Sequence, residues 1–305
     1  MTTLPAHTPY DGSSKLFTIG LRPLDLADWI EVDGNLGAHL AEKRRLYAEI
    51  PEKVFVEQPG TREAQSEALD LIGAHLLECH PATHRAAGNR VEAVGDGSAP
   101  ASGDAPLKAA SLLVQEDLIL MRKDAEGWRL VAGALCFPSS WSLAEKFGRT
   151  MDEIHIPVPA FGPGTRTAGL IGRIFDNLAV EQPVQRFNWS IQAGDHLYHP
   201  LSDRERDVRA ASRSSRFPGG DVEAHAFMRV ERQTLRKLPR SGDILFTIRI
   251  HLDPLRVLAA HPDRPALAAS FVAQLMALDQ AQLDYKGITA DRDRLIATLE
   301  RIAAA

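Results

Sequence analysis

Two pairs of apolar runs, each joined by a short polar turn, constrain the fold of this chain most strongly. Residues 117–123 (DLILMRK) and 128–137 (WRLVAGALCF) flank Asp124-Ala-Glu-Gly127, where glycine can supply the positive φ of a tight hairpin. Residues 224–235 (AHAFMRVERQTL) and 244–252 (ILFTIRIHL) form a second such pair. Strands that follow one another through short turns pair antiparallel. The runs therefore predict an antiparallel sheet.

Helical periodicity surrounds these strands. Residues 36–48 and 62–79 carry apolar side chains at the spacing of one helix face. Shorter or later segments with the same character predict further helices at 139–148, 165–180, 265–279 and 291–304. Antiparallel strands with helices gathered to one side give an α+β class.

Composition identifies the less regular segments. Residues 1–15 are predicted to be a flexible N-terminal tail. Residues 88–105 are rich in Gly, Ala, Ser, Pro and Asp, and residues 202–220 are dense in Arg, Asp, Ser and Gly, so both are predicted to be loops. We expect one domain over 16–256, with the helices of 257–305 packed on it.

The bulk properties narrow the class of protein. A formal net charge of −5 argues mildly against a general nucleic-acid binder. Cys79 and Cys136 lie far apart, which suits a reducing compartment and not a disulfide framework. The sequence has no run of 18 apolar residues and no apolar core of a secretion signal. We therefore expect a cytoplasmic protein with no nucleic-acid or membrane partner.

His155 lies in the most distinctive local segment, Ile154-His-Ile-Pro-Val-Pro159. Thr150 and Glu153 have the spacing of a capping box, which predicts a helical turn that leads to His155 and ends before Pro157. An imidazole fixed in apolar surroundings could ligate an iron porphyrin. The alternative, which composition alone favours, is a half-buried histidine bonded to a backbone carbonyl.

A polar row is the second candidate site. Arg229, Glu231 and Gln233 alternate along one predicted strand and therefore share a face. They could bind a charged ligand, or they could form an ordinary solvated pair of small energetic consequence. Asn188 and Trp189 offer an amide and an indole N–H at a possible pocket edge, the alternative being a packed Trp in a hydrogen-bonded turn.

Missing motifs exclude several kinds of site. No C-x-x-C-H is present, so any haem would be held without thioether links. The sequence also lacks a P-loop, a G-x-G-x-x-G dinucleotide fingerprint and a G-x-S-x-G nucleophile elbow. The pair His196 and His199 has weak metal-ligand spacing and is followed directly by Pro200, which favours a surface loop.

Several segments, taken in order, resemble the family of haem-dependent oxidative N-demethylase alpha subunits. The matching segments are Gly20-Leu-Arg-Pro-Leu-Asp25 with Trp29 and Asp33, Phe137-Pro through Trp141 and Lys146, Ile154–Pro159, Arg186-Phe-Asn-Trp189, Arg229–Pro239 and Ile244–Arg249. Together they span roughly residues 16–256 with similar spacing.

The resemblance implies a PAS-like antiparallel sheet that holds a non-covalent haem b, with surrounding helices. It implies an oxidoreductase of the monooxygenase type that removes an N-methyl group from a small secondary amine, such as dimethylamine, and releases formaldehyde. The implied partners are the alkylamine, O2 and separate flavin and iron–sulfur reductase subunits. The missing dinucleotide motif agrees with such separate electron donors.

On this resemblance, His155 is expected to ligate the haem iron while its other ring nitrogen donates to a carboxylate or backbone oxygen. Glu231 is the expected partner of the alkylammonium. Arg229 is expected to pair with a haem propionate or to orient Glu231, and Asn188 and Trp189 to line the distal side. Two alternatives stay open: a PAS-like haem sensor or gas-binding protein without catalysis, and a haem-free protein that binds a small ligand.

Overall fold

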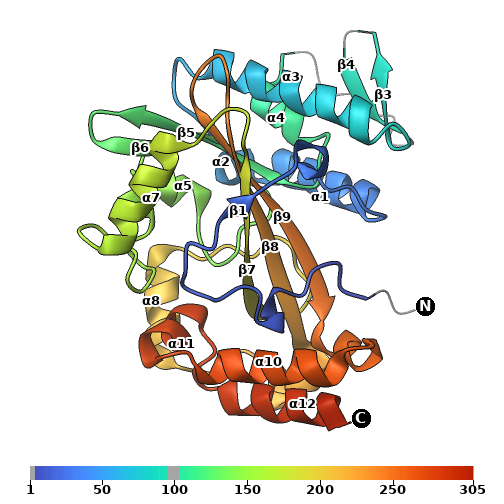
Figure 1. The fold of residues 1–305 in the computed structure, drawn as a ribbon, viewed down its shortest axis with the longest axis vertical. Helices are drawn as coiled ribbons and strands as arrows, with labels where there is room; N and C mark the ends of the chain where they lie inside the picture. The colour runs from blue at the N-terminus through green and yellow to red at the C-terminus, as the bar shows by residue number, and fades with distance from the viewer. Residues whose placement is uncertain (1–3, 89, 95–102, 305) are drawn as a thin grey trace.

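The two predicted hairpins form the centre of a large antiparallel sheet (Figure 1). In the computed structural model, which describes residues 4–88, 90–94 and 103–304, this sheet has seven strands in the order β1-β7-β8-β9-β5-β6-β2. The strands are β1 (Arg22–Pro23), β2 (Phe55–Glu57), β5 (Asp117–Asp124), β6 (Gly127–Ala134), β7 (Val184–Ala193), β8 (Ala226–Lys237) and β9 (Ile244–Pro254). Gly127 follows the β5–β6 turn at φ +130°, as the hairpin prediction required. A separate hairpin pairs β3 (His84–Ala87) with β4 (Arg90–Ala93).

Helices accompany the sheet, so the predicted combination of antiparallel strands with helices is confirmed. The α-helices are α1 (Leu36–Glu49), α2 (Pro51–Val54), α3 (Arg62–Cys79), α4 (Pro106–Ser111), α5 (Leu143–Lys146), α6 (Met151–Ile154), α7 (Arg166–Asn177), α8 (Asp203–Ser212), α9 (Val222–His225), α10 (Arg264–Met276), α11 (Gln280–Lys286) and α12 (Arg292–Ala304). The short 3-10 helices are η1 (Pro9–Asp11), η2 (Leu26–Asp28), η3 (Pro218–Gly220) and η4 (Leu255–Ala260). Among the described residues, no helix is both long and apolar enough to cross a membrane.

The two faces of the sheet bury different side chains. Leu118 and Leu120 of β5 pack with α3 and α4, whereas Ile119 and Met121 pack with α7 on the opposite face. The face of Leu118 is also covered by α10 and α12, which lie at the far end of the long strands β7, β8 and β9 (Figure 1). Helices thus pack on both faces of the sheet, so the prediction that they gather on one side is wrong, and part of the Ile119 face lines a cavity.

The predicted tail and the two predicted loops contain more regular or buried structure than expected. The segment 1–15 was expected to be flexible, but Tyr10 is fully buried and stacks on Phe271 with 4.6 Å between ring centroids. Within 88–105, residues 90–93 form strand β4, while residues 89 and 95–102 lie outside the described part of the chain. The prediction of a loop over 202–220 is wrong in its first half, which is helix α8. Its capping box, Ser202 with Glu205, begins the helix, and its charged composition is that of a solvated helix.

His75 of α3 is a histidine that the fold needs in its neutral form. The backbone N–H of Ile30 donates to His75 Nε2, so this nitrogen must be unprotonated. Burial, with the nearby charges of His80 and Arg236, lowers the pKa of His75 to about 4 from 6.5. The unfolded chain therefore binds more protons than the folded one between pH 6.5 and 4, and stability falls as the pH drops through this window.

Replacing His75 by Gln should flatten this pH dependence, because the Gln oxygen can accept the same hydrogen bond without titrating. We expect the free energy of unfolding of the wild type to fall more steeply between pH 6.5 and 4.5 than that of His75→Gln. The difference in slope should reach up to about 1.4 kcal/mol per pH unit. Urea unfolding at several pH values measures it, and parallel slopes would contradict the assignment.

Candidate functional site

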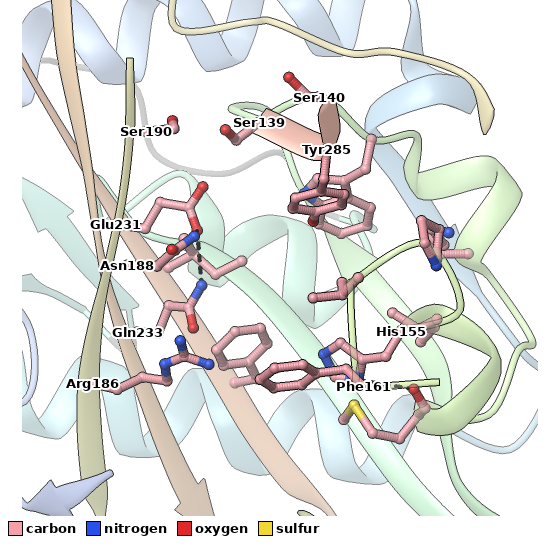
Figure 2. A pocket seen from close by; sticks show the side chains of 18 of the residues that line it. Ser139, Ser140, His155, Phe161, Arg186, Asn188, Ser190, Glu231, Gln233 and Tyr285 are labelled. Atoms are coloured by element: carbon pink, nitrogen blue, oxygen red, sulfur yellow. Dashed lines mark hydrogen bonds between the residues drawn. The ribbon is translucent and has the colours of Figure 1, made fainter. Parts of the chain in front are cut away.

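A cavity lies between the sheet and the segment that contains α5, α6 and α7 (Figure 2). The volume of this cavity is about 280 Å³. Much of the wall is apolar. Examples are Phe17, Ile119, Met121, Phe161, Ile171, Phe175 and Ile248.

His155 follows α6 and lines this cavity. The predicted capping box is present: the Thr150 side chain accepts from the Glu153 N–H, and the Glu153 carboxylate accepts from the Thr150 N–H. His155 Nδ1 lies 3.0 Å from the carbonyl oxygen of Met151. Since a carbonyl oxygen can only accept, Nδ1 carries the proton and Nε2 keeps its lone pair. Figure 2 shows the imidazole directed into the cavity, toward the side chains of the sheet.

The electrostatic surroundings keep this imidazole neutral. Burial lowers the pKa of His155 to about 4; the bond to Met151 opposes this, and the charges of Arg186 and Lys146 add to it. A neutral imidazole with a free Nε2 is the form that binds a metal. The structure confirms the interpretation of a histidine bonded to a backbone carbonyl, and its second nitrogen remains available to a ligand.

Opposite His155, strands β7 and β8 present four polar side chains that form the polar row of the cavity, and Arg229 is not one of them. Asn188 pairs with Glu231 and Arg186 with Gln233, so the four side chains share the cavity face (Figure 2). Glu231 Oε2 accepts from Gln233 Nε2 at 2.8 Å and from Asn188 Nδ2 at 3.3 Å. Burial lowers the pKa of Arg186, and the charge of Glu231 opposes that shift. The row therefore holds the oriented carboxylate of Glu231 near the guanidinium of Arg186. The sequence analysis had named Arg186 only as part of a motif.

Arg229 shares the face of Glu231 but does not line the cavity. Its guanidinium is fully buried and donates to the carbonyl oxygens of Phe137 (2.7 Å), Pro138 (3.2 Å) and Leu197 (3.2 Å), and to Gln192 Oε1 (3.1 Å). Loops fold over this position, so Nη1 and Nη2, which were expected to reach a propionate or Glu231, bond three backbone carbonyl oxygens and the Gln192 amide instead, while Nε has no partner among the described residues. Arg229 joins the sheet to the segment that leads toward His155.

We expect Arg229→Ala to be destabilised by about 3–5 kcal/mol, because it leaves a cavity and several buried carbonyl oxygens without donors. Arg204→Ala, which removes an exposed arginine, is the matched control and should change stability by less than about 0.5 kcal/mol. Urea unfolding of the two variants checks this. A loss below 1 kcal/mol for Arg229→Ala would show that these hydrogen bonds contribute little to stability.

Trp189 faces away from the cavity. Its indole packs edge-to-face on Phe271 with 4.7 Å between ring centroids, and Nε1 donates to Gln274 Oε1 at 3.3 Å. The expectation that Asn188 and Trp189 line the same side is therefore wrong for Trp189. Adjacent residues of a strand point to opposite faces, so recognising β7 as a strand would have separated the two.

Five positive side chains line the cavity around α8 and α11, and the sequence analysis had named only Lys146 among them, as part of a motif. They are Lys146, Arg206, Arg209, Arg216 and Lys286. Asp203 pairs with Lys146 and Arg206, but Arg209 and Arg216 donate mainly to carbonyl oxygens and Ser140.

Burial makes this cluster electrostatically costly. It lowers the pKa of Lys286 to about 8 and, together with the charge of Arg209, that of Arg216 to about 10. Arg209 Nε and His199 Nε2 are buried, and neither has a hydrogen-bond partner among the described residues. Within the described part of the chain, the five cations share Asp203 as the one carboxylate paired with them at the cavity, and Arg209 Nε is a buried donor without a partner, so an anionic group bound here would be stabilised.

A comparison with protein families places most of the chain in one family. A family model described as "Haem-dependent oxidative N-demethylase, alpha subunit-like" matches residues 20–296. The match contains His155, Glu231 and the cationic cluster. It also extends beyond residue 256, where the sequence motifs ended, and so includes α11 with Lys286.

Proposed function

Because the chain belongs to the family of haem-dependent oxidative N-demethylase, alpha subunit-like proteins, we propose that it binds haem b non-covalently and oxidatively demethylates a small secondary amine. The antiparallel sheet would serve as one wall of a PAS-like haem pocket. One observation carries the proposal: His155 is neutral, is held by the Met151 carbonyl, and directs Nε2 into the cavity.

The cavity residues fit a haem group in three respects. The apolar walls suit a macrocycle, and His155 Nε2 suits the iron. The cationic cluster suits two propionates, and the unpartnered Nε of Arg209 is a donor that a carboxylate could satisfy. In this proposal Arg209 and its neighbours replace Arg229 as the propionate partners.

The polar row would bind the substrate. Glu231 would accept hydrogen bonds from the alkylammonium and balance its charge, and the amides of Asn188 and Gln233 hold this carboxylate in place. Figure 2 places Glu231 across the cavity from His155. An amine bound to Glu231 would therefore lie inside the cavity, on the side that faces His155. Positioning of this kind is the protein's contribution to the rate.

When bound, haem would supply oxygen activation and oxidation of the N-methyl carbon, which are the cofactor's own chemistry. Overall, one O2, two electrons and two protons would convert the N-methyl amine into formaldehyde, the demethylated amine and water. The electrons would come from separate flavin and iron–sulfur reductase subunits. The apolar walls would exclude water, while Glu231 would hold the amine proton.

The side chain of Arg186 would influence which secondary amines the cavity binds. A simple dialkylamine would use Glu231 alone, whereas an N-methyl amino acid could place its carboxylate on Arg186 and its ammonium on Glu231. The guanidinium on the same wall as the carboxylate favours the zwitterion as a second candidate. Dimethylamine and N-methylglycine therefore belong in the same assay.

The direct test is to express the protein with a haem precursor, record its spectrum, and measure formaldehyde with a reductant and a panel of methylamines. A Soret band with amine-dependent formaldehyde supports the proposal. A Soret band without formaldehyde from any amine would favour the sensor alternative. Protein without bound haem, even after reconstitution, would favour the haem-free alternative.

A further inference from the structure

A second group of polar side chains lies on the sheet face opposite the cavity. His7 precedes η1, Glu31 follows η2, and His251 lies on β9. His7 Nε2 is 2.9 Å from Glu31 Oε1, and His251 Nε2 is 3.0 Å from Glu31 Oε2. The ligand atoms of all three lie within 4.8 Å of one another. We propose that His7, Glu31 and His251 bind a divalent transition-metal ion, with Zn²⁺ as the best match.

This site is separate from the proposed haem pocket. His251 pairs with Val230, whereas the cavity residue Glu231 pairs with Ile250, so the two sites use opposite faces of the same strands. The metal site therefore does not depend on the proposed function, and either can fail without the other.

The distances suit metal ligation. Zinc binds imidazole nitrogen and carboxylate oxygen at about 2.0–2.2 Å, so two such ligands lie about 3.0 Å apart at a right angle and about 3.4 Å apart at a tetrahedral angle. One oxygen, Glu31 Oε2, lies 3.1 Å from His7 Nε2 and 3.0 Å from His251 Nε2, at the right-angle end of this range. In the metal-free protein each imidazole donates its Nε2–H to the Glu31 carboxylate, and a metal ion would take the place of these two protons.

One ionised carboxylate and one buried guanidinium set the electrostatics of this site. Burial opposes ionisation of Glu31, but hydrogen bonds from His251 and His7 and the charge of Arg232 hold its pKa well below the usual range. Arg232 Nε lies 3.2 Å from Glu31 Oε1 and repels a cation.

The surroundings leave coordination positions open. The three side chains line a pocket that also includes Gln185 and Phe187, and the imidazoles and carboxylate are only partly buried. Two imidazoles and one carboxylate with room for water suit zinc, and also iron(II) or manganese(II). A bound ion would join the N-terminal segment to β9, two parts of the chain that are distant in sequence.

The test uses Zn²⁺ alone as the probe on the untagged full chain, as purified, after dialysis against a chelator. Calorimetric titration should give one zinc per chain for the wild type, and more than tenfold weaker binding for His7→Gln and His251→Gln. His225→Gln, which changes an exposed histidine on α9, should bind like the wild type. No zinc binding by the wild type, or binding unchanged in both ligand variants, would overturn the proposal.

A measurement on the wild type alone covers the case in which a variant misfolds. Zinc at saturating concentration should raise the Tm of the wild type, because it binds only the folded site, whereas Mg²⁺ should not. A Tm that zinc leaves unchanged would overturn the proposal. The Soret band should be the same with and without zinc, which separates this result from haem binding.

Discussion

The His155→Ala variant is expected to bind haem more than tenfold more weakly than the wild type and to show a shifted Soret band. The variant removes the only ring nitrogen that we propose as an iron ligand, while the apolar walls and the cationic cluster stay in place. Loss of even an outer-shell partner commonly costs a metal site 10–100-fold in affinity. Haem titration followed by absorbance measures the change, and amine-dependent formaldehyde should fall to background.

Added imidazole provides the sharpest control for this variant. The cavity left by the side chain can admit free imidazole, which should restore a spectrum like that of the wild type without restoring the covalent tether. His225→Ala, on the exposed helix α9, should behave as the wild type throughout. Unchanged haem content and an unchanged Soret band in His155→Ala would remove His155 as the ligand.

The Glu231→Gln variant should keep its haem but have a much lower kcat/KM for the amine. The substitution preserves the shape of the side chain but removes the charge that balances the alkylammonium in a water-poor cavity. Truncating one partner of a buried charge pair costs about 2–5 kcal/mol. We therefore expect kcat/KM for the amine to fall by roughly two orders of magnitude, mostly through KM if Glu231 only binds the ammonium.

Glu223→Gln removes an equivalent charge from the exposed surface of α9 and is the matched control. Both variants should have the wild-type Soret band, which shows that the cofactor pocket is intact. A change in kcat without a change in KM would instead indicate that Glu231 acts in the chemical step. Equal kcat/KM values for Glu231→Gln and the wild type would contradict its role as the amine partner.

Much of the site could be predicted from local sequence patterns. The Thr150–Glu153 capping box and the turn before His155 depend on hydrogen bonds between residues three or four apart, and both are present. The shared face of Glu231 and Gln233 follows from strand alternation, and the structure places them side by side.

The errors have one physical origin. The family resemblance led us to expect Arg229 at a haem propionate or beside Glu231, but loops from distant parts of the chain bring carbonyl oxygens that its donors bond instead. Arg206 and Arg209 were assigned to a solvated loop because charged residues are usually exposed, yet they line the cavity. Which side chains a loop covers depends on contacts between distant segments, and no local pattern records them.

The amino-acid order alone determined where the central strands run and how the chain arrives at His155, because those features depend on contacts between near neighbours. Only the tertiary structure decided which charged groups face the cavity and which are tied to backbone. It also brought together His7, Glu31 and His251, although His7 and His251 lie far apart in the sequence. Such groupings arise when burial of apolar faces packs distant segments together, and the free energy of that packing belongs to the whole fold.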